Sequence, residues 1–411
     1  MKIKNLDSKQ VIILEAIFIL WCLVLPWTTA GMQIVMVALM VLNIIFSAMN
    51  GQSPVKYHRF YLYAAVYLVT ELISAFNSAH VKTSLMAAFN NDWVVLVIPF
   101  LISLPIRAIW RKRAFQVLLL SVTLAGVYGI IQFFNGVDYI RGVNLVPFGK
   151  FFRAGGGYNF FLTYGGNQLF ALAVAFAFMV SVRDKKYEKG IYLFSFIIIF
   201  LSIIATFTRS SWIGSILIIL LGTFIINKKI FGYTIGLLIV SAVVFFIFIP
   251  DLQNRFFSIF ELSKNEGRIT LWKTSWEIFK HNVLFGIGHG NFNEYFEIYK
   301  VPGFYDATGH AHNDFINVAV LNGLVGLIAW TGMWISWFYY AIKAYSKNIW
   351  QASDRYIILA SILGIAGILI ASFFQCYYTD LENNIFWWFL ASTTLQIIVQ
   401  SDKDKKQMQT S

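Results

Sequence analysis

The chain has 411 residues, of which 58% are hydrophobic and only 13% are charged. Soluble domains carry about 25% charged residues, and a water-facing surface could not hide 40 Phe, 20 Tyr and 13 Trp side chains. The composition therefore excludes a soluble protein and predicts one that crosses a membrane many times. The net charge of +12 does not indicate nucleic-acid binding, because the Lys and Arg residues gather in short loops between apolar segments. Cys22 and Cys376 lie in apolar runs, so neither a disulfide framework nor a Cys-rich zinc site is indicated.

A helix needs about 20 apolar residues to cross a hydrocarbon layer about 30 Å thick. Twelve segments meet this need, and we predict an all-α polytopic membrane protein with about twelve transmembrane helices. The segments are 11–28, 30–48, 60–76, 86–104, 114–134, 160–182, 190–207, 211–226, 231–250, 313–342, 356–376 and 383–400. The first could be a signal peptide, because Lys2, Lys4 and Lys9 precede it. A second span follows at once, which favours an uncleaved helix.

Basic residues alternate between loops and so predict the orientation of the chain. Lys and Arg cluster in the loops at 56–59, 107–113, 183–189, 228–229 and 343–355, whereas the other loops are poor in them. Both termini are therefore expected in the cytoplasm. The expected divisions are 1–250 with helices one to nine, 251–312 as an extracytoplasmic loop, 313–400 with helices ten to twelve, and 401–411 as a cytoplasmic tail.

The segment 251–312 is too long and too polar to be a simple connection, so it is the expected location of a functional site. Aromatic residues recur in it at helical spacing, first after Gly267 and again after Asn291. This spacing predicts two short amphipathic helices. The Gly-rich stretch 285–290 between them indicates a tight turn, because no strand precedes it as a phosphate-binding glycine motif would require.

Three arginines are candidate anion ligands. Arg209 interrupts an apolar stretch at the expected outer end of two helices, where an arginine is disfavoured, by about 2.5–3.5 kcal/mol at the centre of a membrane helix and by less near its ends. It could simply reach a lipid phosphate, but the bias of positive charge towards the cytoplasm favours an anionic ligand. Arg153 and Arg268 are also expected outside. One guanidinium group can donate two parallel N–H hydrogen bonds to phosphate oxygens, so several arginines near one cleft would suit a pyrophosphate. Each arginine alone could instead be a surface charge.

His312 lies where the long loop re-enters the membrane, in the sequence Gly-His-Ala-His-Asn-Asp. Its imidazole could take a proton from a sugar hydroxyl. It could instead form a structural hydrogen bond, and Asn313 or Asp314 could cap the following helix. His310 and His312 could also hold a metal ion together with Asp306 or Asp314, but this spacing is a weak zinc pattern.

Three stretches of the chain resemble the O-antigen ligase family, which also holds O-antigen polymerases. They are Thr-Phe-Thr-Arg-Ser-Ser-Trp at 206–212, the stretch 267–292, and the residues from 310 onward. The last is the most specific, because His312 and Asn313 are followed by nine residues and then by Gly-Leu-Val-Gly at 323–326. This matches the ligase pattern of His, Asn, nine residues and Gly-X-X-Gly. The resemblance covers about residues 150–340, and the first five spans match only in kind.

The resemblance implies an enzyme of the bacterial inner membrane that transfers a glycan from undecaprenyl diphosphate to an acceptor hydroxyl at the outer face. The acceptor of a ligase would be lipid A-core, in lipopolysaccharide biosynthesis. In this family pattern His312 is the catalytic base, Arg209 and Arg268 contact the diphosphate, Arg153 is a looser match, and His310 and Asn313 are secondary site residues. The donor is already activated, so inversion at the sugar and no cofactor are expected.

A catalytic metal is not expected either. The seven acidic residues between 251 and 312 form no Asp-X-Asp or Glu-X-X-His pattern. Arginines, whose charge is fixed, could supply the positive charge instead.

Two other functions stay open at this point. Polymerases of the family are described with an arginine, ten residues and a glycine, and no glycine stands at that distance after Arg153, Arg209 or Arg268. This departure favours a ligase. From another class, twelve spans would also suit a transporter or flippase, but such folds commonly divide into two halves about a cytoplasmic linker. Here the link at 183–189 is short and the largest loop is expected outside.

Overall fold

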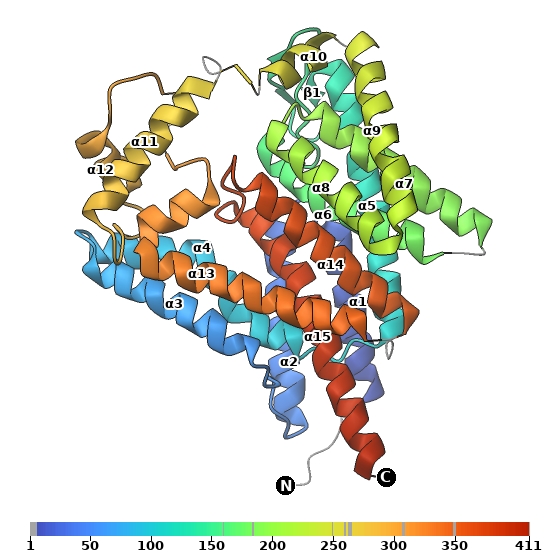
Figure 1. Cartoon of the computed structure of the whole chain (residues 1–411). Helices are drawn as coiled ribbons and strands as arrows, with labels where there is room; N and C mark the ends of the chain where they lie inside the picture. The colour runs from blue at the N-terminus through green and yellow to red at the C-terminus, as the bar shows by residue number, and fades with distance from the viewer. Residues whose placement is uncertain are drawn as a thin grey trace.

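The computed structural model describes residues 6–158, 160–182, 185–248, 250–258, 260–261, 265–305, 309–347 and 351–410. Long helices dominate it, and they run up and down between two ends of a bundle (Figure 1). Each of the twelve predicted spans overlaps one of them. They are α1 (Ser8–Val24), α2 (Thr29–Met49), α3 (Phe60–Asn77), α4 (Val81–Ile102), α5 (Ala108–Asn135), α6 (Phe161–Ser181), α7 (Lys186–Ala205), α8 (Arg209–Ile226), α9 (Lys228–Phe248), α13 (Asp314–Ser346), α14 (Ala352–Ala371) and α15 (Leu381–Thr410).

Nine helices within the described residues are long and apolar enough to cross a membrane, namely α2 to α8, α13 and α14. The prediction of an all-α polytopic membrane protein is therefore confirmed. The helices α1, α9 and α15 occupy the remaining three predicted segments. α9 presents mostly exposed apolar side chains, as expected for a helix that faces lipid.

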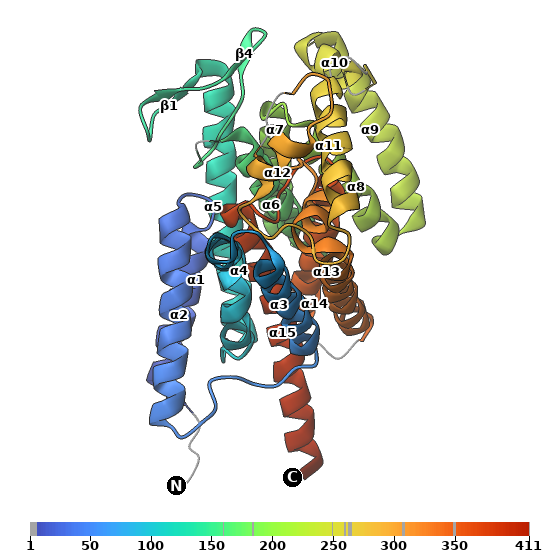
Figure 2. The same cartoon turned by 90° about the vertical axis from the view of Figure 1, so that its left-hand side faces the viewer.

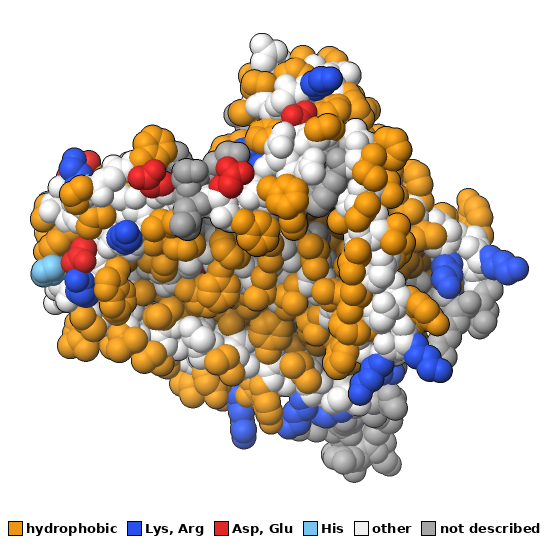
Figure 3. All heavy atoms as spheres, turned by 45° about the horizontal axis from the view of Figure 1, so that its top comes forward, with side chains coloured by type: hydrophobic (Ala, Val, Ile, Leu, Met, Phe, Trp, Pro, Cys, Tyr) orange, Lys and Arg blue, Asp and Glu red, His pale blue; other side chains and the backbone are white. Residues whose placement is uncertain are grey.

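Both chain termini lie at the same end of the bundle, the lower end in Figures 1 and 2. The loop 56–59 between α2 and α3 and the start of α5 at 107–113, which carry two of the predicted clusters of Lys and Arg, also lie towards this end. Figure 3 shows an apolar band across one face, with acidic side chains in the upper part and Lys and Arg both in the upper part and along the lower edge. We call the upper end the site end.

The site end is built from short elements. Two antiparallel hairpins follow α5: β1 (Val137–Asp138) pairs with β2 (Val143–Asn144), and β3 (Pro147–Phe148) pairs with β4 (Phe151–Phe152). Three helices follow α9, namely α10 (Pro250–Phe257), α11 (Glu266–His281) and α12 (Phe292–Tyr299). The segment 251–312 thus holds one helix, α10, that the periodicity of the aromatic residues did not predict.

The core of the bundle is α6, which is almost entirely buried and packs against α7, α8 and α14. Small residues allow the close approach that membrane helices need in place of a hydrophobic driving force. A Cβ atom on Gly214 of α8 would stand 2.7 Å from the carbonyl oxygen of Gly367 on α14. This packing fixes the start of α8, which carries Arg209.

α13 is interrupted at Gly323, whose backbone angles are φ 68° and ψ −172°. The turn that follows α11 fills the interruption. Leu324 donates a backbone hydrogen bond to Val283 (2.7 Å), and Gly288 donates one to Leu321 (2.9 Å). The break therefore fastens the loop 282–291 to the bundle, and it explains why a glycine stands at this place in the Gly-X-X-Gly motif.

Candidate active site

Four arginines gather at the site end from separate elements. Arg153 lies in the loop before α6, Arg209 begins α8, Arg255 lies on α10 and Arg268 on α11. Burial lowers the pKa of the Arg153 guanidinium to about 9, and the charges of Arg255, Arg268 and Arg209 contribute to this lowering. Burial and the charge of Arg268 also lower the pKa of Arg255. The four charges therefore repel one another in a partly desolvated place, and a bound anion would relieve this repulsion.

The arginines are positioned by neutral groups. Arg153 donates to the carbonyl oxygens of Thr206 (3.1 Å) and Phe207 (3.3 Å). Arg255 donates to the same Phe207 carbonyl (3.2 Å), and Arg209 donates to the carbonyl oxygen of Ser258 (2.9 Å). Among the described residues, no carboxylate forms an ion pair with Arg153, Arg209 or Arg255. Within the described residues, their positive charge is therefore not neutralised by an ion pair.

Phe207 is one of two described residues other than glycine with a positive φ, at 51°. Bulky side chains rarely adopt this conformation, and such strain is typical of functional sites. It turns the Phe207 carbonyl towards both Arg153 and Arg255. The tight Thr-Phe-Thr turn between α7 and α8 thus orients two members of the cluster and places the third, Arg209, just after it.

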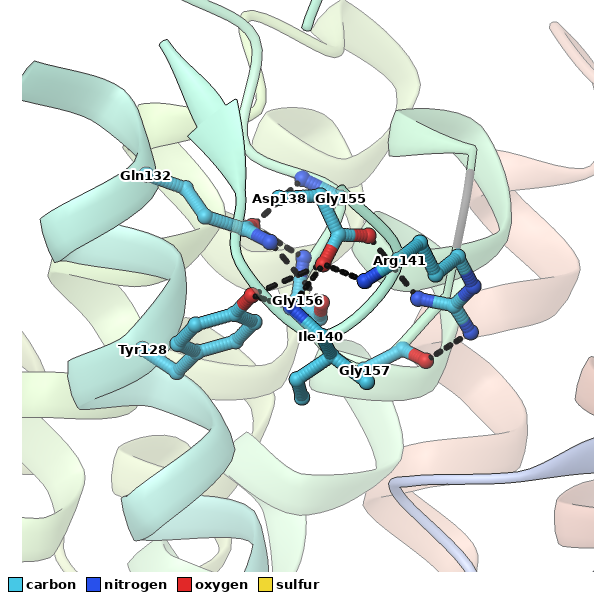
Figure 4. Close-up of polar contacts among 8 residues, drawn as sticks. All are labelled: Tyr128, Gln132, Asp138, Ile140, Arg141, Gly155, Gly156 and Gly157. Carbon is cyan, nitrogen blue, oxygen red and sulfur yellow. Dashed lines mark hydrogen bonds and ion pairs between the residues drawn. The ribbon is translucent and has the colours of Figure 1, made fainter. Parts of the chain in front are cut away.

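A network of hydrogen bonds holds the glycine loop 155–157 that follows Arg153 (Figure 4). The side-chain oxygen of Gln132 accepts hydrogen bonds from two backbone N–H groups of this loop, at 3.1 and 2.7 Å. Arg141 donates to the last carbonyl oxygen of the loop and forms an ion pair with Asp138 (2.9 Å). Arg141 therefore holds the loop in place, and the network fixes the backbone that follows Arg153.

His312 is the second residue other than glycine with a positive φ, at 48°, among the residues that the structure describes. Its Nδ1 atom lies 2.7 Å from the side-chain oxygen of Gln375. With this oxygen as the acceptor, Nδ1 carries the proton and the lone pair of the imidazole is on Nε2. The His312 ring stands edge-on to the ring of His310, with centroids 4.2 Å apart. The contact with Gln375 therefore orients the His312 ring.

His310 supports the neighbouring histidine. Its Nδ1 atom accepts a hydrogen bond from the backbone N–H of His312 (3.2 Å). Burial lowers the pKa of His310 to about 4, and the nearby His312 adds to this effect, so His310 is neutral at ordinary pH. It also lines a cavity of about 270 Å³ between α4, α12 and α13, together with Asn91, His289, Gly290, Phe292, Asn293, Gly309, Asn317, Leu321 and Thr379.

The start of α13 is capped by Asn313. Its side-chain oxygen accepts the backbone N–H of Ile316 (3.1 Å), and its amide nitrogen donates to the carbonyl of Phe373 (2.9 Å). Asp314 has a different role, because one of its oxygens accepts the backbone N–H groups of Tyr377 (2.9 Å) and Tyr378 (3.0 Å). These two residues tie the α14–α15 connection to His312. Asp306, the other carboxylate considered as a metal ligand, lies outside the described residues.

The α14–α15 connection, residues 372–380, links the histidines to the arginines. Gln375 contacts His312, and the hydroxyl of Tyr377 lies 2.8 Å from that of Ser210 and 3.0 Å from that of Ser211. Burial raises the pKa of Tyr377 to about 12, against the opposing effects of these hydroxyls and of the charge of Arg268. The connection therefore reaches from His312 to the residues beside Arg209.

The structure brings together His310, His312, Arg153, Arg209 and Arg268, all of which the sequence singled out. It adds Arg255 and Gln375, which sequence reasoning missed. Arg255 could have been noticed as a further arginine of the long loop. Gln375 belongs to a polar run, Gln-Cys-Tyr-Tyr-Thr-Asp-Leu-Glu-Asn-Asn at 375–384, that separates two apolar spans.

The fold and the site define a polytopic membrane protein with an oriented histidine and an arginine cluster at one end of its helices. Residues 194–331, about a third of the chain, match the family model described as O-antigen ligase. The matched range runs from α7 into α13 and contains Arg209, Arg255, Arg268 and His312. It supports a function of the ligase or polymerase kind. No curated protein matches the chain.

Proposed function

We propose that the protein is a membrane glycosyltransferase of the ligase type, which moves a glycan from undecaprenyl diphosphate to an acceptor hydroxyl. The observation that carries this proposal is the pairing of His312 with Gln375 at the same end of the bundle as four arginines. A base and a concentrated positive charge are the two things that this transfer needs. The matched O-antigen ligase domain supports the same class of reaction.

The arginines would bind the diphosphate of the donor. As the bond between the sugar and the diphosphate breaks, negative charge grows on the leaving group. Preorganised cations in a site shielded from water stabilise such charge strongly. Arg209, Arg255 and Arg268 lie on three different elements, and each guanidinium can present two N–H groups to phosphate oxygens. In this mechanism the positive charge comes from arginine side chains, and no step uses a metal ion.

His312 would act as the base. Its Nε2 atom takes the proton of the acceptor hydroxyl while the hydroxyl oxygen attacks the anomeric carbon of the donor. The new C–O bond forms on the face opposite the diphosphate, the C–O bond to the diphosphate breaks, and the configuration inverts. The Gln375 oxygen, 2.7 Å from Nδ1, stabilises the imidazolium that forms.

The two substrates would reach the histidine from different elements. The arginines come from the loop before α6 and from α8, α10 and α11, whereas the cavity that His310 lines is formed by α4, α12 and α13. We place the acceptor on the cavity side, because His310 is neutral there and offers a hydrogen-bonding ring rather than a competing positive charge. This assigns His310 to positioning.

We place the protein in the inner membrane of a bacterial cell, with the site end on the outer face. The gathering of Lys and Arg at the end with both termini supports this orientation, since cytoplasmic loops carry the excess of positive charge. Surface polysaccharide or lipopolysaccharide is assembled on that face from lipid-linked donors. The segment 251–312 would then be an extracytoplasmic loop.

A reconstitution experiment tests the proposal. The purified chain in proteoliposomes is given an undecaprenyl-diphosphate glycan together with lipid A-core, and in parallel with a second molecule of donor. We expect the glycan on lipid A-core, with inverted anomeric configuration by NMR. Lengthening of the donor glycan instead would identify a polymerase. If the donor crosses the bilayer with no sugar transferred, the chain is a transporter and the proposal is wrong.

A further inference from the structure

A second group of chemically active side chains lies apart from the arginines, beneath the turn 285–290. Glu71 of α3, Asp92 of α4 and His289 of the turn place one potential ligand atom each within 4.8 Å of the others. All three side chains are buried, and each is only 3% exposed. Among the described residues they form the single group of three or more His, Cys, Asp or Glu side chains with this geometry.

The polar atoms of this group are poorly satisfied by the residues that the structure describes. Glu71 Oε1, Asp92 Oδ1 and His289 Nε2 are buried and form no hydrogen bond of good geometry in the part of the chain that the structure describes, although His289 Nε2 lies within ion-pair distance of Glu71 Oε1, at 3.3 Å. The amide of Asn322, which interacts with Glu71 and His289, is also buried, and neither its oxygen nor its nitrogen forms a hydrogen bond of good geometry there. Buried polar atoms of native proteins are nearly always paired with protein, water or an ion. Four neighbouring buried groups without a well-formed hydrogen bond therefore suit a bound ligand.

From this convergence we propose that Glu71, Asp92 and His289 bind a divalent transition-metal ion, Zn²⁺ or Mn²⁺, that fastens the turn 285–290 to α3 and α4. This proposal does not depend on the proposed function.

Charge supports a cation at this place. Two carboxylates and one neutral imidazole would leave two negative charges in a buried position, which is strongly unfavourable without compensation. A divalent ion would cancel both charges. The imidazole ligand suits Zn²⁺, and the two carboxylates also suit Mn²⁺, whereas Mg²⁺ and Ca²⁺ prefer oxygen ligands alone.

The distances suit one ion. Metal–ligand distances of about 2.0–2.2 Å put the ligand atoms of a tetrahedral ion about 3.4 Å apart. His289 Nε2 is 3.3 Å from Glu71 Oε1, which fits this value, and an Asp92 oxygen lies within 4.8 Å of a ligand atom of each. The side-chain oxygen of Asn322 could supply the fourth ligand.

The surroundings of His289 also suit a ligand. Its other ring nitrogen, Nδ1, lies 3.1 Å from the Asn91 side chain. Rotation of the Asn91 amide brings its oxygen to Nδ1, which then carries the ring proton. The lone pair of the imidazole is then on Nε2, which faces the carboxylates. The His289 carbonyl is held in turn by Ser84 of α4, at 3.0 Å. The backbone around the ligand is therefore already fixed.

The ion would have a structural role. His289 and His310 line the same cavity, and the turn pairs with the break in α13. A metal bond from the turn to two membrane helices would fix the wall of that cavity. The reacting atoms of the proposed transfer lie at His312, so the ion would act by positioning alone.

Metal analysis of the full chain in detergent tests the inference. We expect about one equivalent of zinc or manganese by mass spectrometry after purification, or after incubation with ZnCl₂ or MnCl₂ followed by desalting. The conservative variants Glu71→Gln, Asp92→Asn and His289→Gln should each retain at least tenfold less. The matched control is Glu294→Gln, which removes a carboxylate from the exposed Glu294–His80 pair (2.8 Å) and should retain the full equivalent.

The wild-type result decides even if a variant does not fold. X-ray absorption of the bound metal should report one or more imidazole ligands among nitrogen and oxygen neighbours at about 2.0–2.2 Å. Failure of the wild-type chain to hold zinc or manganese under both conditions would overturn the proposal and leave the carboxylates to share protons. Retention of the metal by all three folded variants would place it elsewhere and would overturn the proposal equally.

Discussion

Replacing Gln375 with glutamate tests the proposed base directly. The substitution keeps the shape of the side chain but puts a carboxylate where the amide oxygen now lies, 2.7 Å from His312 Nδ1. Gln375 is only 5% exposed, so little water screens the new charge. A nearby negative charge favours the protonated, cationic imidazole. Because a general base must be unprotonated to work, the variant should need a higher pH than the wild type.

The size of the shift follows from the contact. An opposite charge at this range typically moves a titration by about one to three pH units, equivalent to about 1.4–4 kcal/mol. The acidic limb of the profile of log kcat/KM against pH should therefore move upward by at least about one unit. The rate on the high-pH plateau should change much less, since the introduced carboxylate can still accept the Nδ1 proton and orient the ring.

The assay is transfer from the lipid-linked donor at saturating acceptor, measured between about pH 5 and 9, the range in which a histidine titrates. The control is Gln351→Glu, which adds the same charge at the exposed N-cap of α14, at the opposite end of the bundle. That profile should match the wild type. An unmoved acidic limb in a folded Gln375→Glu protein, or a movement to lower pH, would refute the role of His312 as base.

Four further predictions follow from the same geometry. His312→Ala should lower kcat by about 10²- to 10⁴-fold while donor binding survives, and His310→Ala should lower it less; the reverse order in a steady-state assay would exchange the two roles. Arg209→Lys should also impair turnover, because a point charge cannot replace the paired N–H groups of arginine; full activity would reduce Arg209 to an anchor at the lipid surface. Gly323→Ala should lower the melting temperature, since backbone strain at this φ and ψ costs about 1–3 kcal/mol and a Cβ would stand 2.2 Å from the Leu284 carbonyl; Gly332→Ala, with no atom within 4 Å, is the control. Single cysteines at Lys186 and Lys300 in a Cys-free chain should react oppositely with an impermeant maleimide in spheroplasts, and equal labelling would reject the orientation.

The helices were predictable because their signal is local. A run of about 20 apolar residues must become a helix in lipid, where every backbone group needs an internal partner, and all twelve predicted segments overlap a helix. The break in α13 at Gly323 was not predictable in this way. Its cause is the turn after α11, which lies well before α13 in the chain and fills the gap. No periodicity within α13 carries that information.

The candidate site was predictable where one residue was anomalous in its own surroundings. Arg209 stands out because an arginine in an apolar stretch needs a reason, and His312 stands out by its motif. Gln375 does not stand out, because glutamine is common between two membrane spans. Only the folded structure shows that it contacts His312. Arg255 was missed for a similar reason. The Phe207 carbonyl to which it donates a hydrogen bond and the neighbouring charge of Arg153 are both distant from it in sequence.

The backbone itself marks the two halves of the proposed site. Phe207 and His312 are the two described residues other than glycine in the left-handed region, where such residues are uncommon and strained. One directs its carbonyl to two arginines, and the other presents its ring to Gln375. Both strained positions adjoin the start of a membrane helix, α8 or α13, whose packing can hold them in place. The packed helices thus hold the two strained residues in place, and these residues orient the proposed base and the arginines that would bind the leaving diphosphate.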